Sequence, residues 1–256
     1  MVRAMLDLDL RSEAADHAVA IAAAGALAPA VIATWRGRMI NEHASSYVFD
    51  GLAAQLAALG EAEAAATCRQ FAAEERAHGA MCGAVVAAAG GEARGRGLPV
   101  AVLPTHADTT PRAAAVRNVL SISCLAETVA VALIGAERLE MPEGPLRELL
   151  TRIWADEVGH ARFGWRYVEH ALPRMTAVER DAIARYLPVA FAALEAHELA
   201  HIPIATRWPA EAAAFGLCDG ADARLLVAET VTDVIVPQLA ALGLPAEHAW
   251  HHRRIG

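Results

Sequence analysis

The stretch Asp156-Glu157-Val158-Gly159-His160 and an earlier stretch, Glu74-Glu75-Arg76-Ala77-His78, decide how this chain folds. Each contains a Glu followed three residues later by a His, and residues three apart in a helix lie on one face. Each stretch therefore predicts a helix that presents one carboxylate and one imidazole to the same point. That arrangement is half of a metal site.

Two further glutamates make this pattern informative, because a lone Glu-x-x-His arises by chance about once in a chain of this composition. Glu42 lies 33 residues before Glu75, and Glu127 lies 30 residues before Glu157, each within a long apolar helical pattern. Two helices of roughly 30 residues joined by a tight turn place residues with that separation side by side. Four helices would bring six donors to one level of a bundle: Glu42, Glu75, His78, Glu127, Glu157 and His160.

In this order the six donors resemble the pattern of the ferritin-like di-iron carboxylate superfamily, which includes bacterioferritins, rubrerythrins, bacterial multicomponent monooxygenases, aldehyde-deformylating oxygenase and arylamine N-oxygenases. The resemblance covers residues 29–173. It implies an all-α fold: a ferritin-like four-helix bundle with a long crossover between its second and third helices, and additional N- and C-terminal helices. The implied ligand roles are one metal for each of His78 and His160, bridging carboxylates from Glu75 and Glu157, and terminal ligands from Glu42 and Glu127.

Two acidic residues are candidates for orienting the imidazoles. Metal-bound His usually gives its other ring nitrogen to a carboxylate. Asp156 and Glu74 each stand directly before a ligand glutamate, and they match positions that hydrogen-bond the His of the opposite motif in larger di-iron oxygenases. The resemblance therefore implies that both residues support the cofactor site.

The resemblance further implies a non-haem di-iron oxidase or monooxygenase, in which Glu42, Glu75, Glu127 and Glu157 are catalytic. With two Fe ions, or one Mn and one Fe, it would use dioxygen to hydroxylate, N-oxygenate or desaturate a small organic substrate. No rubredoxin-like Cys pairs are present, so the electrons would come from a separate reductase. The chain has Cys82 where the ribonucleotide reductase small subunit has its radical tyrosine, and Ile153 where arylamine N-oxygenases carry an extra His.

The surroundings of Glu127 favour metal binding over a solvated surface position. It lies in Ser-Cys-Leu-Ala-Glu-Thr-Val-Ala-Val-Ala-Leu, with no other charged residue for nine positions on either side. Burying a lone carboxylate in such a run would cost several kcal/mol, and a bound cation removes that penalty.

Composition bounds the remaining function classes. The chain is 55% hydrophobic with 5% aromatic residues, which suits one helical domain, residues 1–256, with a bundle core at 29–173 and an extension at 174–256. A net charge of -8 argues against nucleic acid as a partner. The four cysteines form no Cys-x-x-Cys, which predicts buried, reduced thiols and a cytoplasmic setting. Residues 18–35 are apolar, but acidic residues precede them, so we expect a buried helix rather than a membrane segment.

Proline and glycine positions divide the chain into expected elements. The predicted helices cover 12–26, 29–59, 61–89, 111–139, 146–171, 177–202 and 221–241. Residues 1–11 are expected to form a frayed or docking N-terminus, and residues 91–111 a loop of about 20 residues, which is unusually long for a compact domain. The last two helices could cap the bundle, wall a cavity or join two copies in a homodimer.

Two other functions stay open. A ferroxidase or iron-storage role uses the same donors, although ferritin subunits lack the extra helices expected here. A zinc hydrolase is suggested by His197-Glu198-Leu199-Ala200-His201, which matches His-Glu-x-x-His, although neither a preceding sheet nor a clear third ligand is evident. Small residues one turn from the donors indicate either a path for substrate or oxygen, or close helix packing: Gly79, Cys82, Ser45, Ser46, Cys124, Val131 and Gly164.

Overall fold

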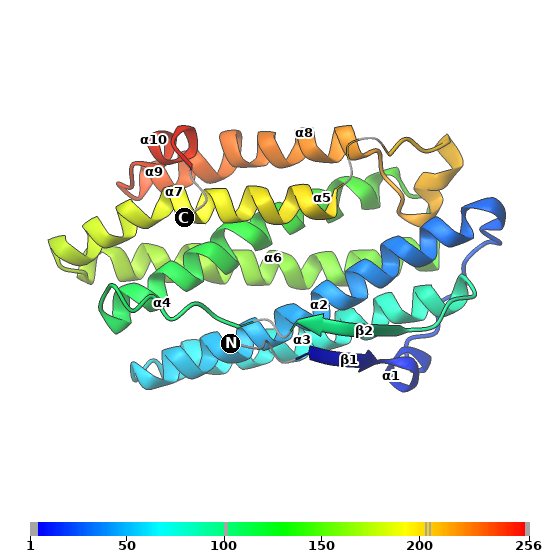
Figure 1. The fold of residues 1–256 in the computed structure, drawn as a ribbon, viewed down its shortest axis with the longest axis horizontal. Helices are drawn as coiled ribbons and strands as arrows, with labels where there is room; N and C mark the ends of the chain where they lie inside the picture. Colours follow the sequence, from blue (N-terminus) through cyan, green and yellow to red (C-terminus); the bar gives the residue numbers. More distant parts are fainter. Residues whose placement is uncertain (1–4, 100–101, 203, 205, 254–256) are drawn as a thin grey trace. The chain divides into compact units, whose positions relative to one another are not determined.

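The computed structural model describes residues 5–99, 102–202, 204 and 206–253. These residues are mainly helical, as the sequence predicts, with one two-stranded sheet (Figure 1). The chain divides into two compact units, each assembled from separated segments. Unit 1 comprises Met1–Leu103, Glu137–Ile153 and Pro209–Leu217; unit 2 comprises Pro104–Ala136, Trp154–Trp208 and Cys218–Gly256. The division into a bundle core and a C-terminal extension stays a prediction.

Two long helices dominate unit 1. Helices α2 (Ala28–Ala58) and α3 (Ala62–Ala88) form a hairpin and pack against each other along their lengths. Pro29 lies in the first turn of α2, where its missing N–H costs no hydrogen bond. Gly60 reverses the chain between the helices with a φ of 79°, a conformation that glycine adopts without strain. The helices predicted at 29–59 and 61–89 are confirmed.

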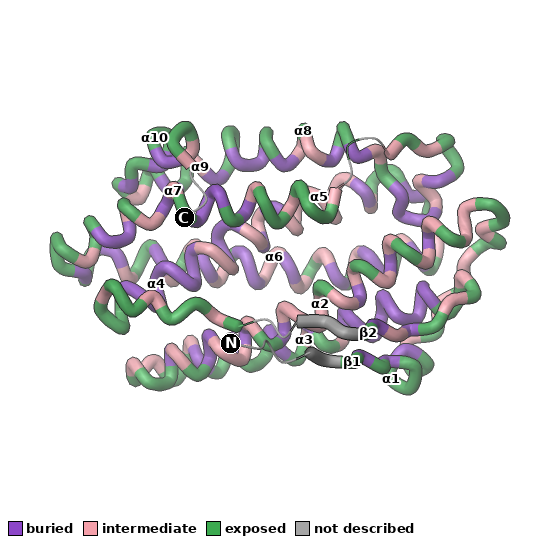
Figure 2. The backbone as a smooth tube through the Cα atoms, viewed as in Figure 1, coloured by how far each residue is buried: buried purple, intermediate pink, exposed green. Residues whose placement is uncertain are grey.

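The core of unit 1 is built from the facing sides of these helices. Trp35 and Phe49 of α2 are fully buried, and Phe49 meets Phe71 of α3 edge to face at 5.5 Å between ring centroids. The indole nitrogen of Trp35 donates a 2.8 Å hydrogen bond to the backbone oxygen of Phe215. Residues 78–86 of α3 are buried without interruption (Figure 2), so more than two turns of this helix have no solvent-exposed face.

A small antiparallel sheet, which the sequence interpretation missed, also belongs to unit 1. Strand β1 (Met5–Asp9) pairs with β2 (Arg94–Pro99), and a register shift falls between Leu6 and Leu8. The docking alternative for the N-terminal segment is therefore confirmed for residues 5–9, whereas the loop expected at 91–111 contains a strand at 94–99. The alternation Leu-Asp-Leu-Asp in β1 was a usable signal, whereas Arg-Gly-Arg-Gly in β2 lacks the β-branched and aromatic residues typical of strands.

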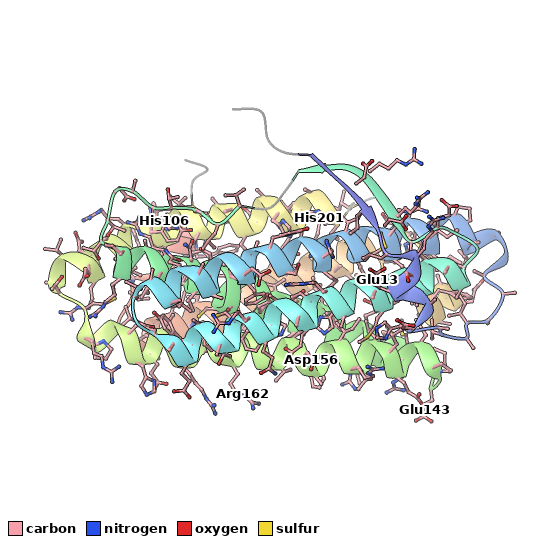
Figure 3. All side chains as sticks on the ribbon, turned by 90° about the horizontal axis from the view of Figure 1, so that it is seen from below. Glu13, His106, Glu143, Asp156, Arg162 and His201 are labelled. Atoms are coloured by element: carbon pink, nitrogen blue, oxygen red, sulfur yellow. The ribbon has the colours of Figure 1, made fainter. Side chains whose placement is uncertain are left out.

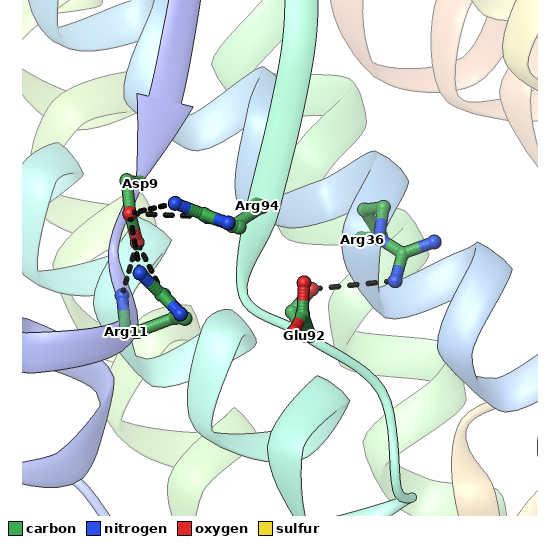
Figure 4. A network of polar contacts seen from close by, with 5 residues as sticks. All are labelled: Asp9, Arg11, Arg36, Glu92 and Arg94. Carbon is green, nitrogen blue, oxygen red and sulfur yellow. Dashed lines mark hydrogen bonds and ion pairs between the residues drawn. The ribbon is translucent and has the colours of Figure 1, made fainter.

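Asp9 ties the end of this sheet together (Figure 4). Its carboxylate accepts hydrogen bonds from Arg11 at 3.0 Å and from Arg94 at 2.7 Å. The bonds from these two guanidinium groups hold the pKa of the Asp9 carboxyl well below its usual range. Nearby, Arg36 of α2 donates to the backbone oxygen of Glu92 at 3.3 Å and so attaches the segment before β2 to the helix.

The first helix is much shorter than expected. Helix α1 covers only Arg11–Ala15, residues 18–24 have no regular structure, and a 3₁₀ turn at Gly25–Leu27 leads into α2. The prediction of a helix over 12–26 was therefore wrong beyond Ala15. No residue of 18–24 is buried, and helix propensity alone does not hold so short a helix without a packed face.

The second half of the helical core runs through residues 111–171. Helix α4 (Pro111–Val119) continues through a π-helical turn (Leu120–Ala126) into α5 (Glu127–Glu140), and α6 (Pro145–Ala171) follows. Thr110 caps α4 by accepting the backbone N–H of Ala113 at 3.2 Å. The helices predicted at 111–139 and 146–171 are confirmed, and both α5 and α6 contribute residues to both units.

The remaining helices lie in unit 2. Helix α7 (Ala177–His201) begins with a capping box between Thr176 and Glu179. It packs against α4 and against α10 (Ala246–His251), and Arg253 pairs with Glu195 of α7 at 2.6 Å. The helix expected at 221–241 consists of α8 (Gly220–Thr230), a π turn (Val231–Ile235) and α9 (Val236–Ala241). Helix α10 was not predicted.

Within the described part of the chain, one helical run, Pro111–Glu140, is long and apolar enough to cross a membrane. A single run of this kind is weak evidence, because the core helix of a globular protein passes the same test. Residues 18–35, the apolar stretch noted in the sequence, do not form one continuous helix.

Candidate metal centre

The first set of candidate ligands lies in unit 1, on the α2–α3 hairpin. Glu42 and His78 are each 18 positions from Gly60, so the hairpin brings them to one level. His78 Nδ1 lies 3.6 Å from Glu42 Oε2, and the ligand atoms of Glu42, Glu75 and His78 all lie within 4.8 Å of one another. Glu75 and His78 are buried, and the Glu42 side chain is 13% exposed.

The second set lies in unit 2, on α5 and α6. The ligand atoms of Glu127, Glu157 and His160 lie within 4.8 Å of one another, and all three residues are buried. His160 Nδ1 is 3.2 Å from Glu157 Oε2, one helical turn away. The predicted convergence of a glutamate with a Glu-x-x-His on the next helix is thus confirmed in each unit. These six buried or half-buried donors, three in each unit, could hold metal ions.

Two tryptophans fix α6 against α5 near the second set. Trp154 donates its indole N–H to the backbone oxygen of Val131 at 3.1 Å, and Trp165 donates to Thr128 Oγ1 at 3.0 Å. The tryptophans lie on either side of Glu157 and His160 in the sequence. The sequence interpretation did not single out these residues, although paired Trp residues within one amphipathic helix are a usable signal.

The π turn Leu120–Ala126 ends directly before Glu127. A π turn contains an extra residue, and it changes the direction in which the following side chains point. Here it approaches α6 so closely that a Cβ on Gly164 would overlap Ser123 and lie 3.0 Å from the backbone nitrogen of Cys124. No residue type in this segment marks a π turn, so the sequence did not predict it.

A buried ion pair lies close to the first set. Arg38, one turn before Glu42 on α2, donates to both carboxylate oxygens of Glu137 at 2.8 and 2.5 Å. Its guanidinium group also lies 4.8 Å from the Trp35 ring centroid. Cys82 is buried nearby, and burial, reinforced by the Glu42 carboxylate, raises the pKa of its thiol. Arg38 and Glu137 were missed as site neighbours, although charged residues inside apolar helices are the usual signal.

Two of the small residues expected near the donors, and the four cysteines, can be compared with the structure. Gly79 and Gly164 are packing positions, because a Cβ on Gly79 would lie 3.3 Å from the backbone oxygen of Met39 and one on Gly164 would overlap its neighbours. Cys82 and Cys124 are buried as predicted, but Cys218 is exposed, so its predicted burial was wrong. Cys218 follows a 3₁₀ turn at the surface rather than a helix face. Among the described residues, no cysteine forms a disulfide.

The two residues carried over as supports for the imidazoles lie on the ligand helices. Glu74 accepts a 2.8 Å hydrogen bond from Gln70 on the same helix. Asp156 is half-buried on α6, where Figure 3 labels it. Their roles at the opposite imidazoles stay predictions.

His197, Glu198 and His201 lie near the end of α7, and both histidines are exposed. Their ring centroids are 4.5 Å apart, and His201 Nδ1 lies 2.8 Å from the backbone oxygen of His197. Burial raises the pKa of Glu198 to about 7. Among the described residues, no third metal donor joins this motif, so the geometry gives no support to a zinc hydrolase.

Comparison of the chain with family models, with characterised proteins and with solved structures finds no match. The assignment of a function therefore depends on the residues and geometry described above. They define a helical protein with buried Glu and His side chains that could hold a metal ion, an arrangement compatible with a di-iron site.

Proposed function

We propose that this protein is a di-iron oxidoreductase that activates dioxygen to oxidise a small organic substrate. The observation that carries the proposal is the repetition of one donor set, a glutamate facing a Glu-x-x-His, in each of the two units. In the proposed fold, α2, α3, the α4–α5 run and α6 form a ferritin-like four-helix bundle, with residues 89–110 as its long crossover.

The proposed centre joins the two sets. Glu42, Glu75 and His78 would hold one ion, and Glu127, Glu157 and His160 would hold the other. Glu75 and Glu157 would be shared between the two ions, as the resemblance implies. Helix continuity supports this assembly, since Glu157 is only about one turn past Ile153, the last α6 residue that belongs to unit 1.

The chemistry of the donors fits a pair of iron ions. Hard carboxylate oxygens suit iron or manganese, and one imidazole for each ion is typical of such sites. Four carboxylates balance the charge of two divalent cations, which removes the cost of burying carboxylates in apolar helices. Glu75, Glu157 and His160 have 1%, 2% and 0% exposure, so bulk water is kept from these three donors. When bound, the two ions supply two-electron redox chemistry toward dioxygen.

The electron source in this proposal is a separate reductase. Cys68 and Cys82 are buried about four turns apart on α3, Cys124 is buried in the π turn before α5, and Cys218 is exposed. They do not form the Cys pairs that an internal iron–sulfur relay requires. The proposal also includes a cytoplasmic location and a homodimer.

Iron loading tests the proposal. The apoprotein is titrated anaerobically with ferrous iron and then exposed to oxygen, with bound iron measured by elemental analysis and the reaction followed by its optical spectrum. We expect two irons per chain and a transient absorption band. Many irons per chain would instead support storage, and a single zinc that is lost on His197→Ala would support the hydrolase.

Matched variants make the test specific to the two sets. His78→Ala and His160→Ala should each lose at least one of the two irons. His170→Ala, which removes an exposed imidazole from the same helix as His160, should keep both. Equal iron content in all three variants would contradict the proposed ligands.

A further inference from the structure

A solvent-open groove of about 320 Å³ crosses the surface of unit 2 between α5, α6 and α9. Its apolar floor is formed by Val131 of α5 and by Val158 and Ala161 of α6. Trp165, Arg162 and Arg166 form its sides. Its volume is at the lower end of the range of roughly 300–1,000 Å³ that is usual for small-molecule sites, so it suits a small ligand.

Two arginines, Arg162 and Arg166, line the groove beside this apolar floor. Arg162 and Arg166 are one turn apart on α6, and like charges at that spacing destabilise a helix. Among the described residues, neither guanidinium group makes a hydrogen bond or ion pair, although Glu169 also lines the groove. Both arginines are exposed, and Arg162 extends from α6 away from the ribbon (Figure 3). An anionic ligand would relieve this repulsion.

Trp165 gives the groove a fixed wall. Its indole N–H is bonded to Thr128 Oγ1 at 3.0 Å, so the ring is held between α5 and α6 before any ligand arrives. A pre-positioned aromatic side chain provides apolar contact area with little loss of conformational entropy on binding.

We propose that this groove binds a small amphipathic carboxylate. Its apolar body would lie on Val131, Val158 and Ala161 against the Trp165 ring, and its carboxylate would accept hydrogen bonds from Arg162 and Arg166. Guanidinium groups form strong charge-assisted hydrogen bonds with carboxylates. This site is independent of the proposed function, because every residue that forms it lies in unit 2 and none of them is a candidate metal ligand.

The position of the groove gives its occupant a route to influence the candidate metal centre. Thr128 directly follows Glu127, and Val158 and Ala161 directly follow Glu157 and His160. A ligand in the groove would therefore contact the same helical turns that carry three donors, from the neighbouring face of each helix.

Isothermal titration calorimetry of the full-length protein with decanoate tests the proposal. Two control ligands are titrated in the same way: decan-1-ol, which has the same alkyl chain but no charge, and inorganic phosphate, which is an anion without an alkyl chain. We expect decanoate to bind at one site, and both control ligands to bind at least about tenfold more weakly, since each lacks one half of the recognised chemistry. Arg162→Gln combined with Arg166→Gln, and separately Trp165→Ala, should each weaken decanoate binding by about tenfold or more.

Arg174→Gln is the matched control, because it removes an exposed arginine just past α6 that does not line the groove. Binding of decanoate that is unchanged in the double variant, or equal affinity for decan-1-ol, would overturn the proposal. Circular dichroism and iron content, measured on the same samples, should be unchanged in the arginine variants. The two proposals can therefore fail separately: decanoate binding tests the groove, and iron content tests the metal centre.

Discussion

His78 Nδ1 lies 3.6 Å from Glu42 Oε2, although the two residues are 36 positions apart in the chain. The hairpin of α2 and α3 turns at Gly60, midway between them, so the contact follows from the lengths of two helices. The same arrangement brings Glu75 into the group, and it creates a buried cluster of acidic and imidazole groups that is costly without a cation. Its stability should therefore depend on metal in a way that ordinary core residues do not.

Glu75→Gln should change stability in opposite directions with and without iron. In the apoprotein the substitution removes a carboxylate that is 1% exposed, so we expect a higher melting temperature than that of the unsubstituted apoprotein. With iron present, the variant should lose most of the stabilisation that binding provides. Calorimetry of the variant and of the unsubstituted protein, each with and without iron, measures the change in melting temperature in both states. A lower melting temperature in the apoprotein would indicate that Glu75 is a structural group instead.

Gly164→Ala should destabilise the protein by about 1–3 kcal/mol, because the new methyl group would overlap Ser123 in the π turn. Gly159→Ala lies on the same helix, and nothing stands within 4 Å of its new methyl group. It should stabilise by roughly 0.5–1 kcal/mol through helix propensity. Urea unfolding measures the free energy of unfolding of both variants. Similar changes in the two variants would show that α6 is not in close contact with the π turn at Gly164.

The Arg38–Glu137 pair should show strong coupling in a double-mutant cycle. Glu137 is 7% exposed and accepts two hydrogen bonds from Arg38, so Arg38→Met leaves a buried carboxylate without its main partner. We expect each single change to cost about 2–3 kcal/mol, and the double change to cost at least about 1 kcal/mol less than their sum. The surface pair of Arg185 and Asp181 on α7 is the control, and its coupling should be below about 0.5 kcal/mol.

Sequence patterns predicted the helices and the donors for the same physical reason. Long apolar periodicity fixes which face of each helix is buried, and a carboxylate placed on that face must find a charged partner. Glu127 was identified from its position 30 residues before Glu157, and the absence of any other charge around it favoured metal binding over a surface position. Helix ends marked by Pro29, Gly60 and Pro111 were also predicted within a few residues, because these residue types restrict the backbone directly.

The features that sequence reasoning missed depend on contacts between distant segments. The pairing of β1 with β2 joins residues about 90 positions apart, and the sequence of β2 lacks the residue types typical of strands. The π turn before Glu127 depends on the close approach of Gly164. Residues 18–24 have high helix propensity, but they find no surface on which to pack, so no helix forms there.

Glu198→Gln should raise stability at alkaline pH and leave it nearly unchanged at acidic pH. Burial raises the pKa of Glu198 from 4.5 to about 7, so the folded state holds this proton more tightly than the unfolded chain does. The resulting stabilisation is complete below about pH 4.5 and is lost as the pH rises to about 7. The amide has no proton to lose. The free energy of unfolding of the variant relative to the unsubstituted protein should therefore increase by roughly 1–3 kcal/mol between pH 5 and pH 8.

Glu195→Gln on the same helix provides the control for this pH dependence. The Arg253 guanidinium lowers the pKa of Glu195, so this carboxyl group is ionised in both the folded and the unfolded state between pH 5 and pH 8. Its substitution should therefore lower stability by the same amount at both pH values. Urea unfolding of the metal-free proteins at the two pH values measures each difference. If Glu198→Gln gave the same flat profile, the carboxyl group of Glu198 would have an ordinary pKa, and the proposed burial effect would be wrong.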